Sequence, residues 1–297
     1  MKKNYLKITA GVMSSAMLIG LCAAGVPAKV IAATEHWNDA SASATQWNQW
    51  KNNWNTYSSN YEHVSLTPGA DQTQLNLAWY SHTTETPAVR IATKQNMDGA
   101  KEFVGTQTEA VTIDGVKYFS NKATVKGLKE NTKYYYQVFQ NGKWQDAETY
   151  TTKSFDSFSF LYVGDPQIGA SKNQTSTEQE KMVSAGNEVS SAAKDNLAAR
   201  NDGYNWNNIL NDAVKDHEDV SFIVSAGDQV NAGKNEREYA AYLGADALAS
   251  LPVATTIGNH DSVSNQYTLH FNNPNAFSDK DANYIQGKTE AGTDYYY

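Results

Sequence analysis

The chain has 297 residues, of which 40% are hydrophobic and 19% are charged, and its formal net charge is −8. Nucleic acids and anionic membrane surfaces bind proteins through basic surfaces, so this acidic composition argues against either as a partner.

Residues 1–33 have the features of a secretory signal peptide. Lys2, Lys3 and Lys7 precede an apolar run that leads to small residues at 28–33. A membrane anchor is less favoured because Gly and Ser interrupt the run. A lipoprotein site at Cys22 is less favoured because Leu21 stands where a small residue is expected.

Cleavage of this signal would change the composition. It removes four of the 24 basic residues and none of the 32 acidic ones, so the mature chain carries a net charge of −12. It also removes Cys22, the only cysteine. We therefore expect no disulfide and no thiolate ligand, so that nitrogen and oxygen atoms alone hold any metal. A secreted, cysteine-free chain with no membrane span fits an extracellular protein of a Gram-positive bacterium. About 260 residues remain, enough for two domains.

Residues 34–61 form a Trp-rich segment that we expect to be helical. Trp47, Trp50, Trp54 and Tyr57 recur at three- and four-residue spacing, which places them on one face of a helix. This face is either an aromatic platform for sugar or cell wall, or a stripe that packs on the next domain. We prefer the packing interpretation.

Residues 62–153 have the pattern of a β-sandwich of the fibronectin III-like type. Short alternating segments such as TQLNLAWY and TKYYYQVFQ are separated by turn signals such as DGVK and NGK. Trp79 occupies an early strand, where a sandwich core needs a large aromatic side chain. Tyr134, in the segment GLKENTKY, resembles a tyrosine corner, whose hydroxyl bonds back to the preceding loop.

Residues 157–297 alternate between strands and helices, which predicts an α/β domain. The apolar runs FSFLYV, VSFIVSA and PVATTI predict buried strands. Helices are expected near WNNILNDAVKDHE and EREYAAYLGADALASL. The polar stretch 170–203 follows the first strand, and it forms either a lid over the site or a solvated excursion.

A short polar motif follows each of these three strands. The motifs are Gly164-Asp165-Pro166-Gln167, Gly227-Asp228-Gln229-Val230-Asn231 and Gly258-Asn259-His260-Asp261. Because ligands bind at the carboxyl ends of the strands in α/β sheets, the motifs are expected to converge. Two carboxylates at one point repel each other unless metal ions lie between them, and two metals form a clamp for displacement at phosphorus. Asn259 offers a further oxygen ligand, and His260 could protonate a leaving alkoxide.

The three motifs resemble those of the calcineurin-like metallophosphoesterases. A β-sandwich in front of them, opening with VSLTPG, is similar to that of the purple acid phosphatases. The resemblance implies that Asp165 binds the first metal, Asp228 bridges both and Asn259 binds the second. It also implies that His260 contacts the phosphate and assists the leaving group, and that Asp261 orients His260.

Two positions depart from the family pattern. Asn231 stands where purple acid phosphatases carry the tyrosine that gives them their colour, and Gln167 stands where other metallophosphoesterases carry a histidine. An amide oxygen is a weaker ligand than either, although Gln167 and Asn231 stay in the candidate ligand set. We expect a colourless site for two divalent or trivalent ions, chosen from Zn, Mn, Fe, Mg and Ca.

The family also supplies later histidines, including a Gly-His-x-His segment, that lie beyond Tyr297. The chain is therefore expected to be an N-terminal fragment whose metallophosphoesterase domain is truncated and inactive alone. His270 is expected to pack in a loop. His36, His63, His82 and His217 are expected to lie outside the site.

The predicted function is that of a secreted, metal-dependent, acid phosphatase-like hydrolase of phosphate esters. The alternative is a non-catalytic cell-surface protein with a degenerate metallophosphoesterase domain. Association with the cell wall is possible on either prediction.

Overall fold

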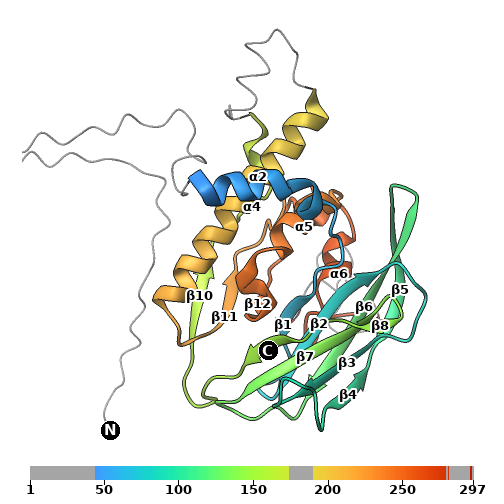
Figure 1. Ribbon diagram of the computed structural model, residues 1–297, viewed down its shortest axis with the longest axis vertical. Helices are drawn as coiled ribbons and strands as arrows, with labels where there is room; N and C mark the ends of the chain where they lie inside the picture. Colours follow the sequence, from blue (N-terminus) through green and yellow to red (C-terminus); the bar gives the residue numbers. More distant parts are fainter. Residues whose placement is uncertain (1–43, 174–189, 279, 281–294, 296–297) are drawn as a thin grey trace, which may run out of the picture. The chain divides into compact units, whose positions relative to one another are not determined.

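The computed structural model describes residues 44–173, 190–278, 280 and 295 (Figure 1). The expected signal peptide, residues 1–33, lies outside these residues. Within the described part of the chain, no helix combines the length and the apolar character needed to cross a membrane.

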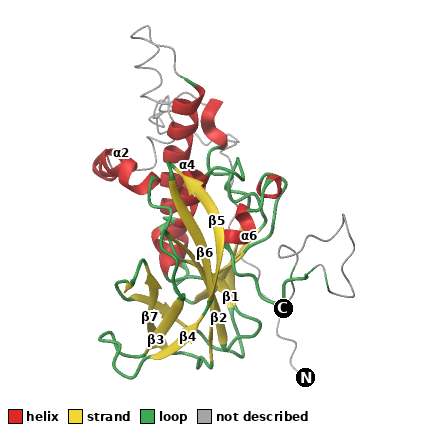
Figure 2. Cartoon of the chain, turned by 90° about the vertical axis from the view of Figure 1, so that its right-hand side faces the viewer, coloured by secondary structure: helices red, strands yellow, loops and turns green. Residues whose placement is uncertain are grey.

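The first half of the chain folds into two antiparallel sheets (Figures 1 and 2). The first sheet has the order β1 (Ser65–Pro68), β2 (Gln74–Ser81), β6 (Val116–Lys126), β5 (Thr106–Ile113). The second has the order β4 (Lys101–Val104), β3 (Ala88–Ala92), β7 (Lys133–Gln140), β8 (Lys143–Trp144), and β9 (Glu148–Thr151) also pairs with β7.

One apolar core lies between these two sheets. Leu75 and Leu77 of β2 share it with Val89 of β3 and Val138 of β7. Trp79 belongs to the same core and is 1% exposed, as its position in the sequence predicted. The hydroxyl of Tyr134 accepts a hydrogen bond from the backbone N–H of Lys129 at 2.8 Å, so the predicted tyrosine corner is confirmed.

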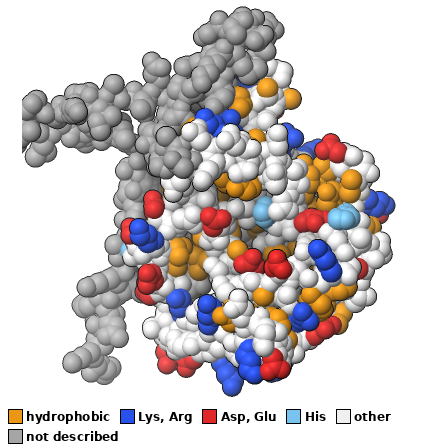
Figure 3. Space-filling model, in the orientation of Figure 1, with side chains coloured by type: hydrophobic (Ala, Val, Ile, Leu, Met, Phe, Trp, Pro, Cys, Tyr) orange, Lys and Arg blue, Asp and Glu red, His pale blue; other side chains and the backbone are white. Residues whose placement is uncertain are grey.

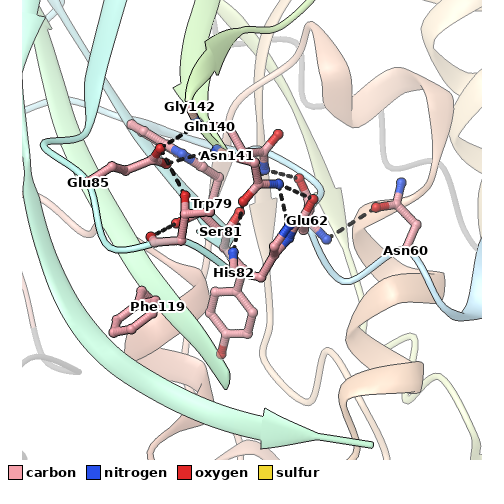
Figure 4. A network of polar contacts seen from close by, with 12 residues as sticks. Asn60, Glu62, Trp79, Ser81, His82, Glu85, Phe119, Gln140, Asn141 and Gly142 are labelled. Carbon is pink, nitrogen blue, oxygen red and sulfur yellow. Dashed lines mark hydrogen bonds and ion pairs between the residues drawn. The ribbon is translucent and has the colours of Figure 1, made fainter. Parts of the chain in front are cut away.

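A polar network closes one end of this β-rich domain (Figure 4). The Glu62 carboxylate accepts two hydrogen bonds from the Asn141 amide, at 3.0 and 2.9 Å, and lies 2.6 Å from Nδ1 of His82. The Glu85 carboxylate accepts from the backbone N–H groups of Asn141 and Gly142 at 3.0 and 2.8 Å. His82 is therefore bound within the β-rich domain, away from the three motifs.

The second half of the chain contains a parallel sheet with the order β10 (Ser159–Val163), β11 (Val220–Ser225), β12 (Val253–Ala254). Helix α4 (Ser191–Asp216) connects the first pair of strands, and α5 (Glu236–Leu243) connects the second. This strand–helix alternation confirms the predicted α/β character.

Helix α4 corrects one of the two interpretations of residues 170–203. It is 26 residues long and is capped by Ser190, whose hydroxyl accepts from the N–H of Ala193 at 3.1 Å. Residues 198–206 of this helix are buried. Residues 198–203 are therefore not part of a solvated excursion, whereas residues 174–189 lie outside the described residues, so a lid there stays a prediction.

The parallel sheet has one open face in the described part of the chain. Phe160 and Tyr162 of β10 are 48% and 68% exposed, and the Phe160 ring stacks on that of Phe222 at 5.6 Å. The prediction that FSFLYV is buried on both faces is therefore wrong for these side chains. A groove of about 850 Å³ runs along this face, and Phe158, Phe222 and Ile257 are among its lining residues.

Helix α2 (Ala44–Ser58) packs its aromatic stripe against α4 and α5. Trp47 and Trp54 are 5% and 4% exposed. The indole N–H of Trp50 donates to the backbone carbonyl of Arg200 at 2.8 Å, and that of Trp54 donates to Oδ1 of Asn196 at the same distance. The packing interpretation of the Trp-rich segment is confirmed.

Residues 34–297 group into one unit by their contacts, so the β-rich and α/β parts pack against each other. Acidic and basic side chains are interspersed on the face drawn in Figure 3, so no extended field of one sign covers that face.

Candidate metal centre

The three motifs follow three adjacent parallel strands and therefore lie at one edge of the sheet. Beyond the ends of β10 and β11, Ile168 and Val230 form a further parallel bridge. The backbone N–H of Gln167 donates to the carbonyl of Asp228 at 2.9 Å, and that of Asn231 donates to the carbonyl of Ile168 at 2.9 Å. The first and second motifs are thus joined through their backbones.

The carboxylate of Asp228 is the point at which all three motifs meet. Its Oδ1 accepts from the backbone N–H of His260 at 2.8 Å, and its Oδ2 accepts from the side-chain amide of Gln167 at 3.2 Å. Asp228 is 9% exposed and has a φ of 48°, a left-handed conformation that few non-glycine residues adopt. The strained backbone turns this carboxylate towards the neighbouring loops.

Gly258 lets the third motif approach that carboxylate. A Cβ atom at this position would lie 1.9 Å from Oδ1 of Asp228 and 2.4 Å from its backbone nitrogen. Any side chain at position 258 would therefore displace either the third motif or Asp228.

Asp261 is fully buried and binds backbone groups. Its carboxylate accepts from the N–H groups of Gln229 at 3.1 Å and Gly258 at 3.0 Å. Burial raises the pKa of this carboxyl to about 6, although the backbone N–H groups act to lower it. Asp261 thus ties the second motif to the third, a role that the resemblance did not imply.

The ring of His260 is oriented by a different group. Its Nδ1 lies 2.6 Å from the backbone carbonyl of Asn231. Because a carbonyl oxygen can only accept, Nδ1 carries a proton, and Nε2 is the nitrogen that can give or take one.

The remaining predicted ligands are less constrained. The side chains of Asp165 and Asn259 are exposed on their loops, and those of Gln167 and Asn231 are half-buried. Among the described residues, no hydrogen bond joins the side chain of Asp165 or Asn259 to Asp228. The structure thus brings Gln167, Asp228 and His260 into contact and places the other candidates on the same rim.

Two buried acids that sequence reasoning missed support this rim. Oδ2 of Asp202 on α4 accepts from the N–H groups of Gly169 at 2.9 Å and Ser171 at 3.2 Å. Oε2 of Glu238 on α5 accepts from the N–H of Ala232 at 2.7 Å. Each carboxylate holds a loop just beyond a motif, Asp202 beyond Gln167 and Glu238 beyond Asn231.

We expect Asp202→Asn to change how stability depends on pH. Burial raises the pKa of Asp202 from 3.8 to about 6. The contribution of this raised pKa to the free energy of unfolding is therefore fully present below pH 4 and is lost as pH rises through 6. Relative to the variant, the wild type should lose up to about 3 kcal/mol of unfolding free energy between pH 4 and 7. Urea titrations at several pH values measure this difference. If the unfolding free energies of wild type and Asp202→Asn changed with pH in parallel, the prediction would be wrong. Asp98→Asn, at an exposed position, serves as the control.

The donor set suits hard cations in its chemistry. Two carboxylates and three amides offer oxygen atoms, which Mg²⁺, Ca²⁺ and Mn²⁺ prefer. Over the residues that the structure describes, no group of three or more His, Cys, Asp or Glu side chains is placed to hold a metal ion. Metal binding would therefore depend on the amides of residues 167, 231 and 259 as well as on the two carboxylates.

Two family models match the chain. The purple acid phosphatase N-terminal domain matches residues 61–152, and the calcineurin-like phosphoesterase domain matches residues 158–295. No curated protein sequence matches the chain.

Two solved structures are similar to parts of it. One is a purple acid phosphatase from seeds of yellow lupin (Lupinus luteus), with 13% identity, 72% of this chain and 40% of that chain covered, and a TM-score of 0.49. The other is PhoD, with 11% identity, 68% and 40% covered, and a TM-score of 0.37. The chain thus spans about two fifths of the length of these structures.

The domain of residues 158–295 belongs to the calcineurin-like metallophosphoesterases, a family of hydrolases that use a dinuclear metal centre. Within that class, the β-rich domain of the chain is the N-terminal domain of the purple acid phosphatases.

Proposed function

We propose that this protein is a secreted phosphoesterase that hydrolyses phosphate esters at a two-metal centre. Asp165, Asp228 and Asn259 would hold the metal ions, with Gln167 and Asn231 completing the ligand set. The meeting of three motif loops at the Asp228 carboxylate carries the proposal. A carboxylate that bridges two metal ions must lie between the loops that supply the other ligands, and Asp228 contacts both neighbouring motifs.

The protein groups around the centre have separate tasks in this proposal. Bound metal ions would supply positive charge for the phosphoryl oxygens and lower the pKa of a water molecule. His260, with Nδ1 held by the Asn231 carbonyl, would use Nε2 to donate a proton to the leaving alkoxide. Asp261 would keep the second and third motifs in register through their backbone N–H groups.

We propose a colourless site, because amides replace the phenolate and imidazole ligands at 231 and 167. We also propose that residues 1–297 alone hold their ions weakly and are inactive. The absence of a three-residue His, Asp or Glu cluster from the described part supports this. Elemental analysis after dialysis measures it, and two retained ions per chain would contradict it.

Asp228→Asn should abolish metal-dependent hydrolysis. With Mn²⁺ in excess, we expect the variant of the mature full-length protein to hydrolyse an aryl phosphate ester at least about 100-fold more slowly than the full-length wild type, because it lacks the bridging carboxylate. The control is Asp98→Asn in the β-rich domain, which should match the wild type. If the mature full-length protein released no phosphate with Mn²⁺, Zn²⁺ or iron, the phosphoesterase proposal would fail.

The proposal also includes secretion from a Gram-positive bacterium. It further includes a division of the mature chain into residues 34–61, 62–153 and 157–297. The signal-like residues 1–33 support secretion. The two antiparallel sheets, of four and five strands, support a fibronectin III-like sandwich, since sandwiches of this type pack two antiparallel sheets over one apolar core. N-terminal sequencing of the protein from culture fluid tests the cleavage site.

A second candidate is a non-catalytic cell-surface protein with a degenerate metal site. The bond from the Gln167 amide to Asp228 favours it, because this bond satisfies the carboxylate without a metal. On this proposal, both the wild type and Asp228→Asn would bind cell-wall preparations equally, and neither would hydrolyse phosphate esters.

A further inference from the structure

The outer face of the first β-sheet is bound to the segment that follows the third motif. Side chains on β1, β2 and β6 donate hydrogen bonds to the backbone carbonyls of residues 268–272. These donors are Ser65 to His270, Thr67 to Asn272 (2.7 Å), Asn76 to Asn272 (2.8 Å), Ser120 to Leu269 (2.6 Å) and Lys122 to Thr268 (2.5 Å). In return, the Asn272 amide donates to the carbonyls of Leu77 at 3.3 Å and Ala123 at 3.1 Å.

This segment includes α6 (Gln266–His270), which both views show beside the first sheet (Figures 1 and 2). The ring of His270 stacks between Tyr80 of β2, at 4.4 Å, and Tyr239 of α5, at 4.3 Å. Its Nε2 lies 2.7 Å from the Glu236 carboxylate. His270 packs outside the metal site, as expected, but it lies at the end of a short helix and not in a loop. It fixes α6 to both domains.

The same segment is bonded to the strand end that leads into the third motif. The hydroxyl of Tyr267 lies 2.9 Å from that of Thr255, three residues before Gly258. Asn273 joins both, because its amide donates to Tyr267 at 3.1 Å and its Oδ1 accepts from Thr255 at 3.2 Å. Beyond the motif, the hydroxyl of Ser264 donates to the carbonyl of Gly233 at 2.6 Å, on the loop after the second motif. The chain is therefore held on both sides of the third motif.

We infer that the β-rich domain positions the third motif, and that Thr67, Asn76, Ser120 and Lys122 are positioning residues for Asn259 and His260. They act through residues 268–273, since none of them touches the motif itself. A domain that served only as a tether would not need hydroxyl, amide and amine side chains that donate to four backbone carbonyls within residues 268–272. The consequence for catalysis rests on the proposed function, whereas the positioning itself does not.

Removal of the three hydroxyl groups that donate to residues 268–272 tests the inference without changing any residue of α6. The variant Ser65→Ala/Thr67→Val/Ser120→Ala changes side chains that are 3%, 1% and 1% exposed. The matched control is Ser81→Ala/Thr152→Val, which removes hydroxyls that are 0% and 3% exposed and that donate to carbonyls within the β-rich domain. Hydrogen exchange of the full chain is measured for the peptide 255–266.

We expect the triple variant to increase exchange at the amides of Gly258, His260 and Ser262 by about tenfold. These amides are protected by hydrogen bonds to Asp261, Asp228 and Gly258, respectively, which depend on the position of the third motif. The control should leave them unchanged, and Thr67→Ser in place of Thr67→Val should restore part of the protection. Equal exchange in the triple variant and the control would overturn the inference. If the triple variant does not fold, Thr67→Val and Ser120→Ala are compared singly with Thr152→Val under the same criterion.

A Mn²⁺ titration separates this inference from the proposed function. If the wild type binds Mn²⁺, its affinity should fall several-fold in the triple variant and remain unchanged in a control of equal thermal stability. Equal affinities in all three would count against positioning. If the wild type binds no Mn²⁺, the metal-centre proposal fails, and the exchange result alone decides whether the β-rich domain positions the third motif.

Discussion

Replacement of Gly258 by alanine is expected to destabilise the protein by about 3 kcal/mol, because the new methyl group overlaps a buried carboxylate and breaks its bond to the next loop. The added Cβ would lie 1.9 Å from Oδ1 of Asp228, which also receives the N–H of His260 at 2.8 Å. The backbone nitrogen of Asp228 would be 2.4 Å away, so rotation of the side chain alone cannot relieve the clash. The third motif must then move away from the second.

Gly164→Ala is the matched control for this substitution. Gly164 belongs to the first motif, but a Cβ there would meet no atom within 4 Å. We expect its unfolding free energy to stay within about 0.5 kcal/mol of the wild type. Urea unfolding of both variants measures the difference, and a Mn²⁺ titration should show weaker binding by Gly258→Ala alone. Equal stability of the two alanine variants would show that the motifs do not meet as described.

The position of the candidate site was predictable because it depends on strand ends. Asp165, Asp228 and His260 each follow an apolar run and a glycine, and parallel strands end at one edge of a sheet. The role of Asp261 was not predictable, because it depends on which backbone N–H groups the turns present to a buried carboxylate. The aromatic face of β10 was misjudged because an apolar run does not say whether one or both faces are covered.

The first half of α4 was missed for a different reason. Its buried residues include Arg200, Asn201 and Asp202, which hide the apolar period of an amphipathic helix. These groups are buried because they have partners: Asp202 accepts from two backbone N–H groups, and the Arg200 guanidinium donates to Oδ1 of Asn201 at 3.0 Å. The partners of Asp202 lie about 30 residues earlier in the chain, so a local sequence pattern does not reveal them. Strands β4 and β5 were missed because most of their side chains are partly or fully exposed and show no apolar alternation.

Trp54→Ala is expected to lower the unfolding free energy by about 4 kcal/mol, the range for removal of a large aromatic side chain from a core. Trp54 is 4% exposed and belongs to the apolar core of the α/β domain. Its indole N–H donates to Oδ1 of Asn196 on α4 at 2.8 Å, so the truncation also leaves a half-buried amide oxygen without its donor. Helix α2 should then detach from α4, because the aromatic side chains of this stripe make the contacts between the two helices.

Two further variants separate packing from polymer binding. Tyr57→Ala, at a 39% exposed position of the same helix, should lower the unfolding free energy by no more than about 1 kcal/mol. Trp54→Phe should fall between the two, since it keeps most of the apolar contact but loses the hydrogen bond. If Trp54→Ala left the urea midpoint unchanged but abolished binding to cell-wall preparations, the stripe would be a binding platform after all. Because its indoles face α4 and bond to it, we expect the loss to appear in stability.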